Sequence, residues 1–282
     1  MSRKQERKEQ KAGRKQARRQ RKSNRITNAL LVICLGVFIF ASYKLIHILL
    51  EYKAGSDEYA ALVQYAPEIS LQQPETSAGT APAGESAAGD TWVKPDSALP
   101  VMDFSELKAI NSDVKAWLTI FDTPISYPVV QTDDDETYLH RTFEGKSNAS
   151  GCLFISQYNT GFDDPNTVIY GHNMKNGSMF HELVSYKDEE FFQKHRYGVL
   201  YTPEKTYWLD IFAAYVVSAD GGFDQVLFSS DEEEAAFFEK LLERAPQQLG
   251  YKAEALAPIL TLSTCTYEYN DARFVVHARI ME

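Results

Sequence analysis

The pattern of apolar and polar residues divides the chain into a long apolar run, a polar segment and a region of short strands. The apolar run covers residues 26–43 with three polar interruptions and continues past Lys44 to Leu50. About 20 apolar residues suffice to cross a bilayer, and a lysine near the end can reach the interface. Residues 26–50 are therefore predicted to be a transmembrane anchor in the lipid bilayer.

Residues 51–91 are predicted to form an extracellular stalk. A weak apolar stripe over 51–70 predicts a short helix, and from about 72 to 90 the residues are almost all Ala, Gly, Pro, Ser, Thr and Glu. Such a composition buries too little apolar surface to offset the entropy of ordering the chain. The folded domain is assigned to residues 92–282.

The folded domain is predicted to be mostly β. Short runs rich in β-branched and aromatic residues, separated by Asp, Asn, Gly and Pro, are typical of strands. They cover residues 116–120, 125–131, 152–156, 167–170, 197–201, 206–217, 258–264 and 273–280. Runs of this kind and number favour a closed or nearly closed eight-stranded barrel.

Four helical segments are predicted, one before the strands and three between them. Short helices are predicted from Asp103, which would cap the first one, and over 178–184 and 188–194. Residues 231–244 have an acidic first turn and apolar residues at helical spacing, which predicts one longer helix before the last two strands.

Charge is distributed unevenly. Residues 1–25 contain twelve Lys or Arg and two Glu, whereas the whole chain carries −10, so residues 26–282 carry −20. The positive-inside rule makes 1–25 a cytoplasmic tail and places the folded domain outside, as in a single-pass type II protein of the cell membrane. A cleaved signal peptide and a nucleic-acid-binding arm are the alternatives. We expect no nucleic-acid partner, because the adjacent span accounts for the charge.

Two of the three cysteines lie outside the span. A Cys152–Cys265 bridge is formally possible, but Cys152 begins an apolar run typical of a buried strand and is interpreted as core packing. Cys265 ends the run Thr-Leu-Ser-Thr-Cys at 261–265, and Arg273 begins the last strand. If the two strands pair antiparallel, Cys265 and Arg273 lie at the same end of the sheet.

These residues suit covalent acyl transfer. An arginine favours the thiolate, which is the nucleophilic form, and can donate hydrogen bonds to an oxyanion. His172, in a glycine-flanked turn after a strand, is a better acid/base candidate than His277. Taken singly, each residue also has an ordinary structural explanation. The histidines and the acidic run 133–136 match no metal-ligand spacing and no nucleotide fingerprint is present, so neither metal nor cofactor is expected.

The 261–265 motif, followed by Arg273 and preceded by Tyr-Gly-His-Asn-Met at 170–174, resembles class B sortases over residues 101–282. The resemblance implies an eight-stranded barrel and a cysteine transpeptidase (a thiol protease by its chemistry) outside Gram-positive cells. It implies that Cys265 is the nucleophile, His172 the general acid/base and Arg273 the oxyanion-binding or substrate-orienting group. Ser263, Tyr170 and Leu139 match positions near the substrate.

The same resemblance implies the partners. The enzyme would cleave a C-terminal sorting signal of Asn-Pro-x-Thr or Ser-Pro-x-Thr type in secreted proteins. It would form a thioacyl-enzyme on Cys265 and pass the acyl group to an amine of a peptidoglycan precursor, which anchors the protein to the cell wall. The segment 221–226 aligns only loosely with the family. A cysteine peptidase that transfers to water and a non-catalytic surface-binding barrel are the alternatives.

Overall fold

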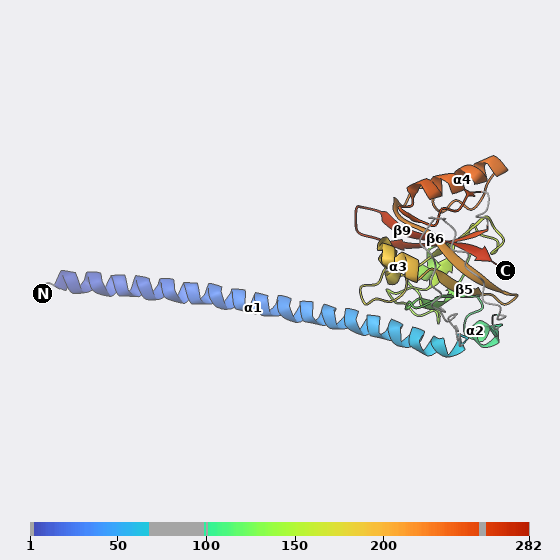
Figure 1. The fold of residues 1–282 in the computed structure, drawn as a ribbon. Coiled ribbons are helices and arrows are strands. Elements are labelled where there is room, and N and C mark those ends of the chain that lie inside the picture. The colour runs from blue at the N-terminus through green and yellow to red at the C-terminus, as the bar shows by residue number, and fades with distance from the viewer. Residues whose placement is uncertain (1–2, 68–98, 100, 254–257, 282) are drawn as a thin grey trace, which may run out of the picture. The chain divides into compact units, whose positions relative to one another are not determined.

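The computed structural model describes residues 3–67, 99, 101–253 and 258–281, and Figure 1 shows the ribbon. The chain divides into two compact units, Met1–Lys53 and Ala54–Glu282. The predicted stalk residues 68–91 lie outside the described residues.

The first unit lies within one helix, α1 (Arg3–Leu62). Among the residues searched, this is the one helix long and apolar enough to cross a membrane, with a mean hydropathy of 2.1 in its most apolar window. Its large apolar side chains between Leu30 and Leu50 are exposed, as they are in a helix that faces lipid.

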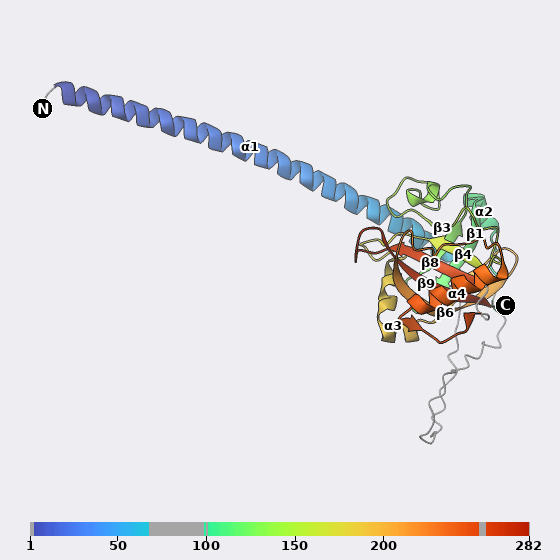
Figure 2. The same ribbon diagram turned by 90° about the horizontal axis from the view of Figure 1, so that it is seen from above.

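The second unit contains a closed β-barrel (Figures 1 and 2). The strands are β1 (Val114–Ile120), β2 (Ser126–Val130), β3 (Leu153–Ile155), β4 (Asn166–Tyr170), β5 (Tyr197–Tyr201), β6 (Thr206–Ser218), β7 (Gln247–Gln248), β8 (Ile259–Cys265) and β9 (Ala272–Met281). Their order in the sheet is β5-β1-β2-β3-β4-β8-β9-β6-β7, and pairing of β5 with β6 closes the ring. This confirms the predicted eight-stranded barrel, to which the two-residue β7 is added at β6.

The long strand β6 makes closure possible. Its first residues pair with β5 and Trp208–Ser218 pair with β9, with an irregularity in register between Ile211 and Ala213. An irregularity of this kind bends a strand and increases its local twist, which lets one strand serve two neighbours. The sheet therefore has no break between its first and last long strands.

Helices cover the barrel or connect its strands. They are α2 (Ser105–Ile110), η2 (Thr137–Leu139), η3 (His181–Lys187), α3 (Glu189–Lys194) and α4 (Asp231–Arg244). The predicted bounds of α4 are correct, and its Phe237, Phe238 and Leu241 pack against β6, β8 and β9 in one buried cluster. In Figure 2, α4 lies across these strands.

Two helix starts differ from the prediction. Asp103 is not the N-cap residue of α2, because Phe104 holds that position and Asp103, one residue earlier, accepts a hydrogen bond from the Ser105 amide. The helix predicted over 178–184 is the 3-10 helix η3 and begins at His181. Asp188 does cap α3, since its side chain accepts from the Phe191 amide.

The C-terminal part of α1 packs on the barrel, although the sequence assigned it to the stalk. Tyr59 is 5% exposed and donates to the Gly151 carbonyl, while the carboxylate of Glu58 accepts from Thr142 Oγ1 and the Glu144 amide at 3.0 Å each. Gly151 has φ +58, and a Cβ there would come within 2.5 Å of the Tyr138 carbonyl oxygen. Polar bonds from Glu58 and Tyr59, together with the buried side chain of Leu62, hold this end of α1. The weak apolar stripe predicted a helix here but not its docking on the barrel.

Replacing Tyr59 with Phe is expected to lower the free energy of unfolding by about 1–2 kcal/mol, because the buried Gly151 carbonyl loses its donor. Urea denaturation of the full chain in detergent measures the change. Tyr158→Phe is the matched control, since Tyr158 is 62% exposed. Equal stability of the two variants would contradict a stabilising role for this contact.

Candidate active site

Strand pairing brings the candidate residues to one end of the barrel. In the antiparallel β8–β9 pair, Cys265 lies directly opposite Arg273, which confirms the predicted proximity. In the parallel β4–β8 pair, Tyr170 lies opposite Ser263. The chain continues from Tyr170 through Gly171, whose amide donates to the Ser263 carbonyl at 3.1 Å, to His172. The register of three adjacent strands thus delivers all these side chains to the same rim.

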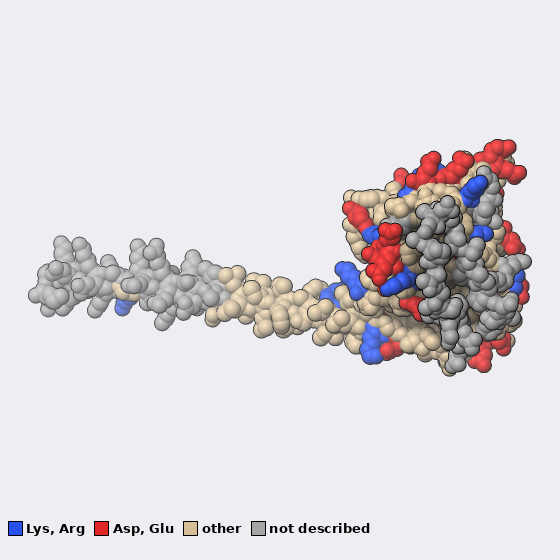
Figure 3. Space-filling model, viewed as in Figure 1, with Lys and Arg blue, Asp and Glu red and all other residues tan. Residues whose placement is uncertain are grey.

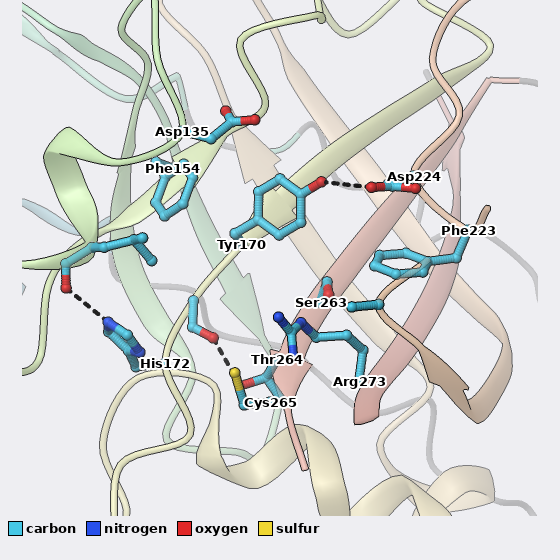
Figure 4. Close-up of a pocket in the computed structure, with 13 residues that line it drawn as sticks. Asp135, Phe154, Tyr170, His172, Phe223, Asp224, Ser263, Thr264, Cys265 and Arg273 are labelled. Atoms are coloured by element: carbon cyan, nitrogen blue, oxygen red, sulfur yellow. Dashed lines mark hydrogen bonds between the residues drawn. The ribbon is translucent and has the colours of Figure 1, made fainter. Parts of the chain in front are cut away.

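A cavity of about 300 Å³ opens at this rim (Figure 4). All six residues singled out from the sequence line it: Leu139, Tyr170, His172, Ser263, Cys265 and Arg273. Figure 4 shows the sulfur of Cys265 and the guanidinium of Arg273 pointing into the cavity, with the imidazole of His172 at its other side. The structure therefore gathers every predicted site residue around one space.

The imidazole of His172 is oriented by a backbone carbonyl. Its Nε2 lies 2.7 Å from the Leu139 oxygen. A carbonyl only accepts, so Nε2 carries the proton and Nδ1 is left to gain or lose one. Gly171 allows the close packing behind the ring, since a Cβ there would lie 2.3 Å from Leu153 Cδ2 and 2.7 Å from Phe180 Cδ2. The backbone oxygen of Leu139 is a contribution that side-chain reasoning could not predict.

Asn173 fixes the backbone of the cysteine. Its Nδ2 donates to the Cys265 carbonyl at 2.9 Å, and its Oδ1 accepts from His181 Nδ1 at 2.7 Å. Thr264 Oγ1 adds a bond to the Gly171 carbonyl at 2.8 Å. The turn that carries His172 is thus tied to the strand end that carries Cys265. Asn173 entered the prediction only as part of the 170–174 motif, although a polar residue beside His172 is the signal that could have revealed this role.

The opposite wall of the cavity combines a phenol, a carboxylate and an unpaired hydroxyl. Tyr170 donates to Asp224 Oδ2 at 3.4 Å, and burial together with the Asp224 charge raises the pKa of Tyr170 well above its usual value, so the phenol stays protonated. Ser263 Oγ is buried and has no hydrogen-bond partner among the described residues. An unsatisfied buried hydroxyl costs about 1–3 kcal/mol, which a polar ligand can recover.

Buried Asn166 holds the loop that completes this wall. Its Nδ2 donates to the carbonyls of Phe223 and Gln225 at 3.1 and 2.9 Å. Phe223 and Asp224 line the cavity, and neither was predicted to be a site residue. They belong to 221–226, the segment that resembled the family only loosely, so a resemblance could not assign them.

The remaining thiol and imidazole candidates are buried in the core. Cys152 is 1% exposed and forms no bridge, as predicted, and burial raises its pKa to about 12. His277 is fully buried between Thr261 Oγ1 at 2.9 Å and the Tyr215 hydroxyl at 3.2 Å, and burial lowers its pKa to about 3. Neither group contacts the cavity. Over the described ranges, no three His, Cys, Asp or Glu side chains cluster as a metal site would require.

Comparison with known proteins finds similarity to sortases in each case. The Sortase domain family matches residues 118–281. The chain is 36% identical over 186 residues to a protein named Sortase B from Listeria monocytogenes, covering 64% of this chain and 74% of that protein. It is 28% identical over 182 residues to Sortase B of Staphylococcus aureus, covering 64% and 75%.

Solved structures are similar as well. A sortase B structure from B. anthracis in complex with AAEK1 matches with a TM-score of 0.65 and 31% identity, covering 83% of this chain and all 100% of that one. A Staphylococcus aureus sortase B–substrate complex matches with a TM-score of 0.59 and 27% identity, over 64% and 84% of the two chains.

Thiol reactivity is expected to separate the two cysteines of the barrel. In a Cys34→Ser background, iodoacetamide should alkylate Cys265, whose half-buried sulfur opens onto the cavity, and spare Cys152, because the thiolate is the reactive form and burial suppresses it there. Peptide mapping by mass spectrometry measures both. Complete labelling in urea is the control, and faster modification of Cys152 in the folded chain would contradict the assignment.

Acid stability is expected to depend on His277. The unfolded state binds a proton at this imidazole below about pH 6.5, whereas the native state does not until about pH 3. The unfolded state therefore binds one more proton than the native state between about pH 6.5 and pH 3. The free energy of unfolding is unaffected by this group above pH 6.5 and falls by about 1.4 kcal/mol per pH unit below it. His277→Gln should flatten this slope in urea titrations between pH 6.5 and 4, and His140→Gln, at an exposed site, should not. Parallel slopes in all three proteins would contradict the burial of a neutral imidazole.

Proposed function

We propose, on the premise that this chain belongs to class B of the sortase family and is a cysteine transpeptidase, that Cys265 cleaves a sorting signal and transfers the acyl part to an amine. Membership in this family decides against the non-catalytic barrel. The observation that carries the proposal is the direct pairing of Cys265 with Arg273 at the cavity that His172 also lines.

The first half-reaction follows from the positions of these groups. The thiolate of Cys265 attacks the scissile carbonyl carbon, and the guanidinium of Arg273 donates to the oxygen that becomes negative. The imidazole of His172 donates a hydrogen bond from Nε2 to the Leu139 carbonyl. Its Nδ1 faces the reaction and gives a proton to the leaving amine.

The substrate would lie along the wall formed by Tyr170, Ser263 and Leu139. Ser263 Oγ is buried without a described partner, so a peptide amide or side-chain amide of the substrate would satisfy it. A polar first residue, as in Asn-Pro-x-Thr or Ser-Pro-x-Thr signals, is consistent with this hydroxyl and with the nearby carboxylate of Asp224.

The apolar helix supports a place at the membrane. We assign residues 1–25 to a cytoplasmic tail, 26–50 to a single-pass type II anchor, and the catalytic domain to the extracellular face. Exposed apolar side chains between Leu30 and Leu50 and the twelve basic residues before them support this topology. The substrates would then be secreted proteins, and the second substrate an amine of the peptidoglycan precursor.

The test uses the full chain in detergent micelles with a panel of sorting peptides and triglycine as the amine. Mass spectrometry is expected to show cleavage and an amide product with triglycine in at least one case. Cys265→Ala should abolish both products, with Cys34→Ser as the matched control. Hydrolysis that dominates at saturating triglycine would identify a peptidase instead, and no cleavage across the panel would contradict the proposal.

The planar guanidinium is tested separately. Arg273→Lys keeps the charge but loses the paired donors, so we expect kcat/KM for peptide cleavage to fall by about 100-fold. Arg279→Lys on the same strand is the control. Equal activity of the two variants would contradict the oxyanion role.

A further inference from the structure

Four residues near the end of α1 form one buried face of the helix. Gly55, Glu58, Tyr59 and Leu62 follow the spacing i, i+3, i+4 and i+7, which places them on the same side. All four are buried, whereas the residues between them are exposed. The face belongs to the second compact unit, Ala54–Glu282, so its contacts are made within that unit.

This face holds the loop of residues 141–151. Glu58 and Tyr59 bind the two ends of the loop through the hydrogen bonds described above. Gly55 allows the helix backbone to approach closely, since a Cβ there would lie 2.8 Å from Ser150 Oγ. The loop is thus fixed to the helix by three neighbouring contacts.

The end of the loop lies directly against the carbonyl that orients the imidazole. A Cβ on Gly151 would lie 2.9 Å from the Leu139 oxygen and 3.1 Å from the Leu139 carbonyl carbon. The Cys152 amide also donates to the Tyr138 carbonyl at 2.9 Å, which ties the two segments together. The Leu139 oxygen is the atom that lies 2.7 Å from His172 Nε2. A displacement of Gly151 would therefore move the hydrogen-bond partner of the imidazole.

The same helix face supports the turn that carries the imidazole. The rings of Tyr59 and Tyr127 pack edge to face, with 5.4 Å between their centroids. The Tyr127 hydroxyl accepts from the Met179 amide at 3.1 Å, and the Phe180 amide donates to the His172 carbonyl at 2.9 Å. The end of α1 thus supports both segments whose separation sets the distance from Nε2 to the Leu139 oxygen.

We propose that Glu58 and Tyr59 are positioning residues for His172, so that the general-acid step depends on the C-terminal end of α1. The inference rests on the proposed function, in which His172 protonates the leaving amine. Neither residue is among those that line the cavity. Both therefore act through the backbone that they hold and not by contact with the substrate.

A misplaced imidazole would slow one kind of substrate only. When the C–N bond breaks and the thioester on Cys265 forms, the departing amine needs a proton, which Nδ1 of His172 supplies. A 4-nitrophenolate group leaves as a stable anion and needs no proton. Attack by Cys265 and stabilisation by Arg273 are common to both substrates. The ratio of the two release rates therefore reports on the imidazole, whereas a loss of folded protein lowers both rates equally.

The experiment uses the full chain in detergent micelles and two substrates with the same acyl part. One is a sorting peptide with an amide at the scissile bond, and the other is the corresponding 4-nitrophenyl ester. Single-turnover release with the enzyme in excess gives a rate constant for each. Tyr59→Phe and Glu58→Gln should each slow amide release by about tenfold, a part of the roughly 10²–10⁴-fold that general-acid catalysis contributes, and change ester release by less than about twofold.

Two further variants calibrate the result. Ser230→Ala removes the hydroxyl that accepts from the Glu233 amide at the start of α4, a surface helix with acidic side chains along it (Figure 3). Loss of a helix cap lowers stability by an amount similar to that expected for Tyr59→Phe, so the amide-to-ester ratio should stay unchanged. His172→Gln gives the full size of the effect and should slow amide release far more than ester release.

The outcomes separate this inference from the proposed function. A lower amide-to-ester ratio in Tyr59→Phe and Glu58→Gln, with an unchanged ratio in Ser230→Ala, supports the positioning role. An unchanged ratio in either variant overturns the role of that residue and leaves the transpeptidase proposal standing. A ratio lowered equally by Ser230→Ala also overturns it, because any loss of stability would then act on His172. Equal slowing of both substrates by His172→Gln would instead overturn the general-acid role on which the inference rests.

Discussion

The hydrogen-bond ladder of β8 with β4 on one side and β9 on the other is the constraint on which the site depends. It sets Cys265 opposite Arg273 and Tyr170 opposite Ser263. A slip of one residue in either pair would turn these side chains to the other face of the sheet. Because β8 is buried almost along its whole length, core packing fixes its register. The positions of Ser263 and Cys265 near its end are fixed by the same packing.

The same residue types serve two purposes in this barrel, and position decides which. Cys265 is half-buried at the end of β8, whereas Cys152 is sealed in the core with a raised pKa. His172 stands at the cavity with one nitrogen bonded to a carbonyl, whereas His277 is held neutral between two hydroxyl groups. Reactivity here follows from access to solvent and substrate, which the end of β8 at the cavity gives to Cys265 and which the core denies to Cys152 and His277.

The sequence predicted those parts of the molecule in which burial in the core dictates a repeated pattern of residue types. Short runs rich in β-branched and aromatic residues located the barrel strands, and helical spacing behind an acidic first turn gave the bounds of α4. The pairing of Cys265 with Arg273 followed from an antiparallel connection. The sequence did not predict contacts made by backbone oxygens, such as that of Leu139, or by a single polar side chain, such as Asn173. The docking of Glu58 and Tyr59 was missed because two polar side chains leave no periodic signal.

The central claim is that a sulfur atom carries the acyl group between two substrates. The most direct measurement is the mass of the intact chain after rapid mixing with a cleavable sorting peptide in the absence of amine, followed by acid quenching and peptide mapping. The account predicts an added mass equal to the acyl part of the peptide, located on the fragment that contains Cys265 and removed by triglycine. An adduct on another residue, or cleavage that continues at full rate in Cys265→Ala, would contradict it.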